Sequence, residues 1–489
     1  MGYKSTIGLE IHSELKTNSK MFCSCKNDPD EKRANYNICP TCTGQPGTLP
    51  VANEEAIRKV LKTGMALNCK ISEISKFDRK NYFYPDLPKG YQISQYDKPF
   101  CKEGFLDING KKIRITRIHL EEDTGRLLHE EGEKSSLVDF NRAGIPLMEL
   151  VTEPDIETGI EARKFAEELQ LILRYLGVSD ADMEKGQMRV EVNISVSKDK
   201  KLGTKVEIKN LNSFKVVEKS IDFEIKRQIK VLESGEKVVQ ETRGWHDKKE
   251  ITFSQREKEE AHDYRYFPEP DLPTLHFEKE FLNKIKSEIL ELPSQKRARF
   301  SYEYGLDERA TEIFIQNKDL SEYFEKVVSE FRTWIKDIEN RENIDEEVEL
   351  IKLNKIASNY IISDVLGLMV GKQFVEKEFK IIPENFAEFI TMIYENEISS
   401  KIAKIVLPEM LKTGKDPSHI IEDKGLEQIS DVGKLEQVIK MVIDNNPKSV
   451  VDYKAGKQNA LQFLAGQAMR ETKGAANPVK IQELLKKML

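Results

Sequence analysis

The spacing of apolar residues changes near residue 292, and this change limits the folds open to the chain. Before that point apolar and polar residues alternate, over 190–196 and again over 205–209, which is typical of strands with one buried face. A short turn-forming segment separates the two runs, so they predict a hairpin. After that point apolar residues follow helical spacing, for example over 353–361 and 386–394. The sequence therefore predicts an α+β protein with its strands in the first part.

Three domains are expected from this pattern. They are a mixed sheet-and-helix domain over 1–292, a helical domain over 293–411 and a small helical tail domain over 412–489. A chain of 489 residues has room for two to four domains of ~100–200 residues each. Within the first domain a helix is expected over 160–176, because Gly177 follows it as a typical helix end.

Composition excludes several classes of protein. Hydrophobic residues make up 39% of the chain, enough to bury real cores, so the chain is not a disordered tail. Mean hydropathy is −0.54, and no apolar run approaches the ~20 residues of a membrane span. The first residues lead directly into a strand-like segment without the features of a signal peptide, so we expect a cytoplasmic protein with no membrane partner.

The charge balance differs between the two ends of the chain. The net charge of −7 excludes a uniformly basic nucleic-acid binder. From residue 401 onward, however, 15 Lys/Arg stand against 11 Asp/Glu. This excess indicates an anionic partner for the tail or is ordinary scatter, and charge alone does not separate the two readings.

Four of the six cysteines lie within twenty residues, as two close pairs: Cys23, Cys25, Cys39 and Cys42. Two pairs of thiolates at this spacing can close a tetrahedral zinc site, with the intervening loop folding back. A site with four protein ligands has no open position, so its expected role is structural. The alternative is four unrelated buried cysteines. Cys69 and Cys101 lack the context of a nucleophile and are expected to be packing residues.

An early strand carries a second possible site. If residues 8–14 form a strand, Gly8, Glu10, His12 and Glu14 share one face. A carboxylate beside an imidazole can hold a metal ion or transfer a proton. The alternative is a solvated polar face, which is common on strands.

Further acidic clusters at strand-like positions support the first reading. They lie at 119–123, 148–153 and 189–193. Several carboxylates facing one cleft repel each other unless cations lie between them, and such a cleft suits Mg²⁺ carried with nucleotide phosphates. Basic residues among these clusters could neutralise a transferring phosphoryl group: Arg114, Arg117, Arg142, Arg189, Lys205 and Lys209.

Two segments mix cations with aromatic residues, at 76–92 and 264–273. Such a mixture can bind a nucleotide or a tRNA end by stacking and charge, or can be a surface loop with a buried aromatic anchor. No Walker-type or Rossmann-type glycine motif is present, so those nucleotide sites are not expected.

Five motifs together resemble the B subunit of the aspartyl/glutamyl-tRNA amidotransferases. They are IGLEIH at 7–12, KFDRKNYFYPD at 76–86, EEDTG at 121–125, DFNRAGIPL at 139–147 and YRYFPEPDLP at 264–273. The match runs from end to end of the chain. The resemblance implies that the first domain is an antiparallel-sheet cradle similar to the catalytic fold of glutamine synthetase, with a zinc-binding insertion. It also implies that the tail domain binds tRNA.

The resemblance implies a ligase that takes part in protein biosynthesis. In this family, ATP and Mg²⁺ are used to phosphorylate the side-chain carboxylate of misacylated Glu-tRNA(Gln) or Asp-tRNA(Asn). Ammonia from glutamine hydrolysis then converts the activated group to an amide. The A subunit of the amidotransferase supplies the ammonia and its C subunit wraps around the other two, so a heterotrimer is expected. No amidase-like glycine/serine signature is present in this chain, so the partner is needed.

The resemblance also assigns residues. The family's metal-binding positions correspond to Glu10, His12, Glu122 and Glu149, which we expect to hold catalytic Mg²⁺. The expected ATP-binding residues come from the aromatic segment and the charged clusters: Arg79, Lys80, Tyr82, Arg189, Glu191, Asn193 and Lys205. The four clustered cysteines are expected to hold structural zinc.

Two other functions remain open on the residues alone. One is a non-catalytic RNA adaptor built from the zinc cluster, the helices and the basic tail. The other is an ATP-dependent ligase acting on a free small carboxylic acid. An adaptor has no need for Glu10, Glu122 and Glu149 to converge, so convergence is the discriminating observation.

Overall fold

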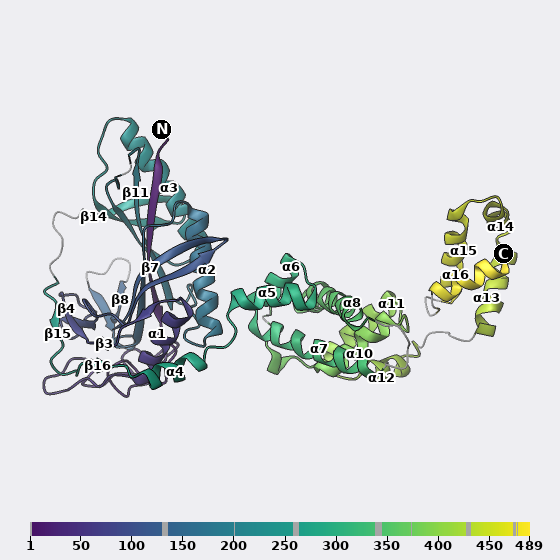
Figure 1. Ribbon diagram of the computed structural model, residues 1–489, viewed down its shortest axis with the longest axis horizontal. Helices are drawn as coiled ribbons and strands as arrows, with labels where there is room; N and C mark the ends of the chain where they lie inside the picture. The colour runs from purple at the N-terminus through teal and green to yellow at the C-terminus, as the bar shows by residue number, and fades with distance from the viewer. Residues whose placement is uncertain are drawn as a thin grey trace. The chain divides into compact units, whose positions relative to one another are not determined.

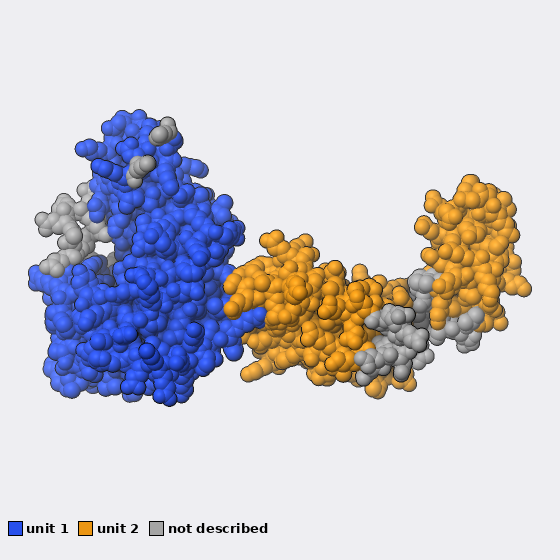
Figure 2. Space-filling view, in the orientation of Figure 1, with its two compact units in different colours: residues 1–293 blue, residues 294–489 orange. Residues whose placement is uncertain are grey.

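The computed structural model describes residues 2–129, 135–199, 201–257, 264–337, 345–372, 374–426, 432–472, 476 and 478–489. The chain forms two compact units, residues 1–293 and 294–489 (Figure 2). This division lies one residue from the first predicted domain boundary.

A nine-stranded sheet is the framework of the first unit (Figure 1). Its order is β14-β13-β12-β11-β1-β10-β7-β6-β2. In that order the strands span Ile251–Glu257, Glu241–His246, Val206–Leu211, Met188–Ser197, Lys4–Glu14, Pro146–Thr152, Lys111–Glu122, Cys101–Ile108 and Lys70–Ile71. All neighbours pair antiparallel except β12 and β13, which pair parallel because α3 (Phe214–Glu233) connects them as a crossover.

The predicted hairpin and the predicted alternation are both confirmed. β11 pairs antiparallel with β12, and Ile194 lies opposite Val206. On β1, Leu9 and Ile11 are buried in the main apolar core. The predicted α+β class is confirmed. One pair of neighbouring strands, β12 and β13, is parallel, whereas an antiparallel sheet was expected.

Helices cover the apolar side of the sheet. α1 (Glu54–Ala66), α2 (Gly159–Tyr175) and α3 contribute to the same core as the strands (Figure 1). α2 confirms the predicted helix: the side chain of Thr158 accepts a hydrogen bond from the backbone of Glu161 at its start, and Gly177 after its end has a φ of 64°. With the apolar face covered, the polar face of the sheet is left for a site.

The first unit also has three small sheets, two of which bring distant segments together. Their strands are β15-β4-β5 (Phe267–Pro268, Asp78–Asn81 and Tyr91–Ser94), β16-β3 (Leu275–His276 and Ile74–Ser75) and β8-β9 (Arg126–His129 and Ser136–Asp139). The first joins the second aromatic segment to the first one, and the second pairs the residues just outside those two segments. α4 (Lys279–Ser287) follows β16 and packs on α1.

The second unit is helical, as predicted. Its longer helices are α5 (Pro293–Tyr304), α6 (Glu308–Gln316), α7 (Lys318–Asp337), α8 (Glu346–Asn359), α10 (Pro383–Tyr394), α11 (Ser400–Thr413), α12 (Pro417–Asp423), α13 (Val432–Asn445), α14 (Pro447–Lys454), α15 (Gln458–Glu471) and α16 (Pro478–Met488). Short turns lie between α8 and α10: a π-helix (Tyr360–Val365), α9 (Leu366–Leu368) and a 3₁₀ turn (Glu376–Glu378).

The last four helices have an apolar cluster of their own, which begins at Leu435 and includes Leu464 and Leu485. The second predicted boundary, between 411 and 412, falls inside α11, and α12 packs on α10 and α11.

Among the described residues, no helix combines the length and the apolar character needed to cross a membrane.

Two glycines inside helices give a matched test of packing. A Cβ on Gly64 of α1 would lie 2.3 Å from Sγ of Cys101, which is fully buried, whereas a Cβ on Gly466 of α15 would meet no atom within 4 Å. Ala is favoured over Gly in a helix by about 0.5–1 kcal/mol. We expect Gly466→Ala to stabilise the chain by that amount.

We expect Gly64→Ala instead to destabilise the first unit by about 1–3 kcal/mol, because overpacking outweighs helix propensity. Urea unfolding followed by circular dichroism, with the transition of each unit fitted separately, measures both changes. Equal stabilisation by the two substitutions would show that the contact between α1 and Cys101 is not tightly packed.

Candidate functional site

A row of charged side chains crosses the polar face of the sheet. Along β1, Glu10 and His12 alternate with the buried Leu9 and so lie on the other face. The register places His12 opposite Glu149 of β10, and Glu149 opposite His119 of β7. Three adjacent strands therefore align two imidazoles and a carboxylate.

Glu149 lies between the two imidazoles. Its Oε2 is 3.3 Å from Nε2 of His12 and 3.3 Å from Nε2 of His119. Oε1 of Glu10 is 3.8 Å from Nε2 of His12, and Oε2 of Glu121 is 3.7 Å from Nε2 of His119. Two overlapping groups result, each with its ligand atoms within 4.8 Å of one another: Glu10, His12 and Glu149, and His119, Glu121 and Glu149.

The donor set of this cluster fits a divalent cation. Glu121 and Glu149 are buried, and Glu10 is partly buried. Three carboxylates this close repel each other, and their oxygens are the donors that Mg²⁺ and Mn²⁺ prefer. The two imidazoles can act as further ligands or as hydrogen-bond donors that hold Glu149 in place.

The protonation of the cluster depends on charge balance. Burial by itself lowers the pKa of His12, but its hydrogen bond to Glu149 and the nearby carboxylates outweigh burial and raise the pKa to about 9. The pKa of His119 is raised to about 9 in the same way, against burial, by Glu149 and Glu121. Burial, reinforced by Glu149, raises the pKa of Glu10 to about 7. The cluster therefore relies on positive charge to keep its carboxylates ionised.

A cavity of about 680 Å³ lies over this row. Glu10, His119 and Glu149 line it, together with three cations from three different strands: Lys80, Arg117 and Lys209. Arg117 lies 3.4 Å from Oε1 of Glu149, and Nζ of Lys209 lies 2.9 Å from Oε2 of Glu191. The cavity thus places carboxylates and cations side by side.

Glu122 is not part of this cluster, which corrects the prediction that it would join Glu10, His12 and Glu149. Its carboxylate accepts a hydrogen bond from the backbone of Ile93 at 2.9 Å and binds Nζ of Lys89 at 2.6 Å. Consecutive residues of a strand face opposite sides, so a shift of one position along β7 exchanges Glu122 for Glu121.

Of the predicted nucleotide-binding residues, some lie at the cavity and others have structural partners elsewhere. Lys80 lines the cavity, and the ring of Tyr82 packs edge-on against Tyr264 with centroids 6.0 Å apart. Arg79 instead forms a two-pronged ion pair with Glu269, with nitrogen–oxygen distances of 2.7 and 2.8 Å. That pair fastens β4 to the segment after β15.

The predicted residues on β11 lie on the polar face beside β1. Arg189 is opposite His12, Glu191 opposite Glu10, and Asn193 opposite Gly8. The guanidinium of Arg189 lies 3.3 Å from Asp123, so the carboxylate of Asp123 balances the positive charge of Arg189.

The amide oxygen of Asn193 is buried and, within the described part of the chain, accepts no hydrogen bond. Lys205 is exposed just before β12 and does not line the cavity, whereas Lys209 of β12 does.

Several residues of the site were missed by sequence reasoning. They are Gln95, Tyr96, Glu207, Thr242 and Gln255. The sequence clusters did include His119, Glu121, Tyr84, Lys209, Tyr264 and Tyr266, but these were not among the residues assigned to the metal or to ATP. Period-2 spacing from Arg117 through His119 would have selected Glu121 over Glu122. Nothing in the local sequence signals that Gln255 or Tyr96 joins the same cavity, because small sheets and long-range strand pairing place them there.

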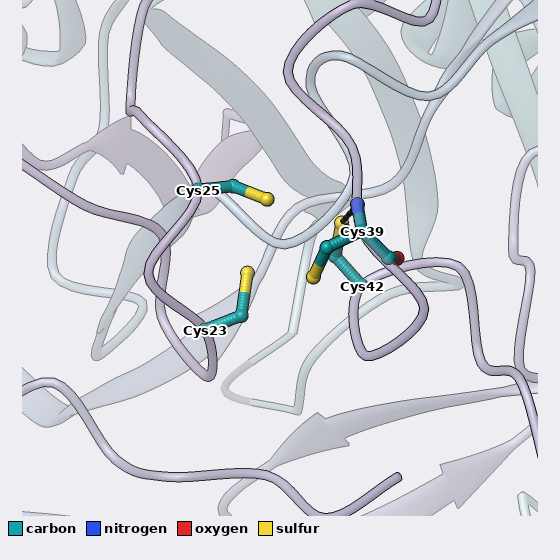
Figure 3. Close-up of side chains that lie close together, drawn as sticks. All are labelled: Cys23, Cys25, Cys39 and Cys42. Atoms are coloured by element: carbon teal, nitrogen blue, oxygen red, sulfur yellow. Dashed lines mark hydrogen bonds between the residues drawn. The ribbon is translucent and has the colours of Figure 1, made fainter.

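The four clustered cysteines form a separate group, in which all sulfur atoms lie within 4.8 Å of one another (Figure 3). Cys42 is buried and the other three are partly buried. The contact with Cys23, and then the nearby ammonium of Lys20, lower the pKa of Cys42 to about 5 against the effect of burial. Thiolates are the zinc-binding form of cysteine, so this set fits a zinc ion.

Lys20 is an unusual neighbour for these cysteines because it is a buried lysine, only 1% exposed. Its Nζ lies 3.8 Å from Sγ of Cys42 and donates to the backbone oxygen of Phe140 at 3.3 Å. A buried ammonium is stable only beside negative charge, and four thiolates around one zinc ion carry a net charge of −2. The buried charge of Lys20 therefore supports zinc binding by the four cysteines, although Lys20 is not itself a ligand.

Comparison with known proteins agrees with this architecture. A family model described as the GatB/GatE catalytic domain matches residues 5–283, and one described as the GatB domain matches residues 342–489. The chain is 48% identical, over all of its length and 99% of the relative, to the B subunit of the aspartyl/glutamyl-tRNA(Asn/Gln) amidotransferase of Thermotoga maritima. The chain belongs to this family of amidotransferase B subunits.

Other members of the B-subunit family show the same extent of similarity. Those of Caldanaerobacter subterraneus and Persephonella marina are 48% and 46% identical, each over the full length of both chains. The resemblance seen in the sequence motifs is thereby confirmed. The acidic cluster, its cavity and the four cysteines all lie within the part that matches the catalytic domain.

The position of Lys20 gives a test of the cysteine site that does not touch a ligand. We expect the purified protein to contain about one zinc per chain and Lys20→Met to lose zinc to a competing chelator about 10- to 100-fold more readily. Lys26→Met is the matched control, because Lys26 adjoins Cys25 but pairs with Asp28 at the surface. Zinc content by mass spectrometry is the measurement.

Two results would contradict this account of the cysteines. Absence of zinc in freshly purified protein would reject the site itself. Equal zinc retention by the Lys20→Met and Lys26→Met variants would reject the role of Lys20.

Proposed function

We propose that this chain uses ATP and Mg²⁺ to activate the side-chain carboxylate of Glu-tRNA(Gln), Asp-tRNA(Asn) or both, in the cytoplasm. Ammonia then converts the activated carboxylate to the amide of Gln-tRNA(Gln) or Asn-tRNA(Asn). Membership of the amidotransferase B-subunit family supports the proposal. The observation that carries it is the convergence of Glu10, His12, His119, Glu121 and Glu149 beside a cavity lined by three cations.

Activation is needed because a carboxylate is a poor electrophile. In the first step a carboxylate oxygen of the substrate attacks the γ-phosphorus of ATP, the bond to the bridging oxygen breaks and ADP leaves. In the second step the nitrogen of ammonia attacks the acyl carbon and the bond to the phosphate oxygen breaks. One proton passes from nitrogen to the departing phosphate, so the products are an amide and inorganic phosphate.

The residues of the cluster divide the work of the first step. Glu10, Glu121 and Glu149 would hold Mg²⁺, with His12 and His119 as further ligands or as donors that orient Glu149. When bound, Mg²⁺ stabilises negative charge on the phosphates. Lys80, Arg117 and Lys209 are placed to bind the anionic groups of the substrates and to offset their mutual repulsion.

The cluster argues against an RNA adaptor, because an adaptor gains nothing from gathering two buried carboxylates and a partly buried one. Their repulsion and desolvation destabilise the fold unless a cation is bound there. A ligase for a free carboxylic acid would use the same cluster, and family membership favours the tRNA-linked substrate.

The remaining parts of the proposal concern partners and zinc. The A subunit of the amidotransferase, a glutaminase, supplies ammonia, and the C subunit holds the other two together as a heterotrimer. The cysteine site holds zinc in a structural role, since four protein ligands leave no position for a substrate.

The tail helices α13–α16 bind tRNA under this proposal. Residues 432–489 carry ten Lys/Arg against five Asp/Glu, and these helices have an apolar cluster of their own. An excess of cations on a small folded unit suits contacts to phosphates.

Two buried glutamates on adjacent strands give a matched test of the proposed metal site. Both Glu149 and Glu122 are less than 5% exposed, but only Glu149 belongs to the cluster. We expect Glu149→Gln to lower ATP-dependent amidation at least 100-fold and to raise the Mg²⁺ concentration needed for half-maximal activity, because a ligand is lost. Glu122→Gln should leave that Mg²⁺ concentration unchanged.

The measurement is amidation by the full amidotransferase assembly, with Mg²⁺ or Mn²⁺ titrated at saturating ATP and with both misacylated tRNAs. Free glutamate serves as the control substrate. Unchanged activity of the Glu149→Gln variant would remove the cluster from the mechanism, and amidation of free glutamate would overturn the tRNA-linked substrate.

Salt dependence tests the tail. We expect Lys486→Gln with Lys487→Gln, two exposed positions on α16, to weaken tRNA binding and reduce the slope of log affinity against log salt by up to about 2. Lys352→Gln with Lys355→Gln on α8 is the matched control. Filter binding of tRNA from low to physiological salt gives both slopes. An identical slope for the two double variants would exclude these lysines from the tRNA contact.

A further inference from the structure

Four tyrosines from two distant segments pack together beside the acidic cluster, and three of them, Tyr96, Tyr264 and Tyr266, line the cavity over it. Tyr96 stacks on Tyr266, with ring centroids 4.4 Å apart and planes 12° apart. Tyr266 contacts Tyr264 at 6.1 Å, and Tyr264 contacts Tyr82 at 6.0 Å, both edge-on. The rings therefore make a continuous aromatic surface, which we call the tyrosine wall.

The tyrosine wall is not part of an apolar core. Tyr96 is 62% exposed, and the adjacent Tyr84 is 61% exposed. A ring that served only to anchor a loop would be buried by the chain it anchors. Here exposed aromatic area faces a cavity that is otherwise lined by charged groups.

The scaffold beneath the tyrosine wall is well fixed. β15 pairs with β4, so Phe267 lies opposite Arg79, and the ion pair of Arg79 with Glu269 ties the same two segments together. Glu269 is 2% exposed, so this pair is shielded from water. Rigid support lowers the entropic cost of binding a flat ligand on exposed rings.

Charges next to the tyrosine wall complete the chemistry of a nucleotide site. Nζ of Lys80 lies 5.0 Å from the centroid of Tyr264 and 5.9 Å from that of Tyr82, so the rings hold this cation at the cavity. Aromatic rings beside a cationic groove are the combination that binds a base and its phosphates together. Since Lys80, Arg117 and Lys209 line the same cavity, a ligand with anionic groups suits it better than a purely apolar one.

One polar side chain of the cavity can recognise the edge of adenine. Gln255 of β14 lines the same cavity. A carboxamide offers a donor and an acceptor side by side, which is the pattern that the edge of adenine requires.

We propose that the tyrosine wall, with Tyr96 and Tyr266 at its centre, stacks an adenine base beside the acidic cluster. This inference rests on the proposed function, which supplies two sources of adenine: the base of ATP and the 3′-terminal adenosine of the tRNA. Both carry a group that has to reach the cluster, a triphosphate in one case and the linked amino acid in the other.

The first arm of the test measures the nucleotide. Binding of AMP-PNP with Mg²⁺ to the full amidotransferase assembly is followed by calorimetry for Tyr96→Ala, Tyr266→Ala and Tyr266→Phe. Loss of stacking on one base is expected to weaken binding about 5- to 100-fold, and the Tyr266→Phe variant, which keeps the ring, should bind as the parent does. Tyr302→Ala, at an 89% exposed tyrosine of α5, is the control.

The second arm measures the tRNA end. Uncharged tRNA(Gln) is compared with the same tRNA lacking its terminal adenosine, for the parent and for each ring variant. If the terminal adenosine stacks on the tyrosine wall, its removal weakens binding by the parent but has no further effect on the Tyr266→Ala variant, as in a double-mutant cycle.

The two arms of the test distinguish ATP from tRNA as the source of the adenine. Weaker AMP-PNP binding alone assigns the tyrosine wall to ATP, and loss of the terminal-adenosine effect alone assigns it to tRNA. Unchanged binding in both arms, or a Tyr266→Phe variant as weak as Tyr266→Ala, overturns the proposal. Because Tyr96 is largely exposed, its truncation leaves the core intact and guards against misfolding. The Mg²⁺ titration of the Glu149→Gln variant tests the proposed function independently, so the two can fail separately.

Discussion

Buried negative charge has to be balanced on the polar face of the nine-stranded sheet, and much of the first unit is arranged around that requirement. Glu121 and Glu149 are buried side by side, with Glu10 at the edge of the cavity. Removing carboxylates from water is unfavourable unless positive charge or hydrogen bonds replace the lost solvation. His12 and His119 supply part of the balance, and the cations of neighbouring strands supply more. A divalent ion with nucleotide phosphates would complete it.

The strand order explains how residues far apart in the chain meet at this face. β1 lies between β10 and β11, and β7 follows β10, so the first strand of the chain pairs within a group of strands that lie more than ninety residues after it in the sequence. Helices cover the opposite face with an apolar core. The sheet is therefore a rigid floor, and chemical groups placed on it keep their spacing because the register is fixed by that core.

Contacts within the first unit also fix the positions of two other sites, the tyrosine wall and the cysteine cluster. The tyrosine wall depends on the short pairing of β15 with β4 and on the buried ion pair of Arg79 with Glu269. The cysteine cluster depends on a loop that folds back beside Lys20 and on a turn stabilised by the bond from Thr43 to the backbone oxygen of Cys39. In both cases a charged side chain has a structural partner inside the protein: Arg79 pairs with Glu269, and Lys20 contacts Cys42.

Local sequence determined the secondary structure, the face of each strand and the four-cysteine set, because these depend on spacing along the chain. The alternation of β1 identified Glu10 and His12, and Gly177 marked the end of α2. Motif resemblance identified the family. Only the tertiary structure brought Tyr266 onto Tyr96 and put Lys209 in place of Lys205 at the cavity. Those choices depend on which strands become neighbours and in what register, and long-range pairing of that kind leaves no periodic signal in the sequence.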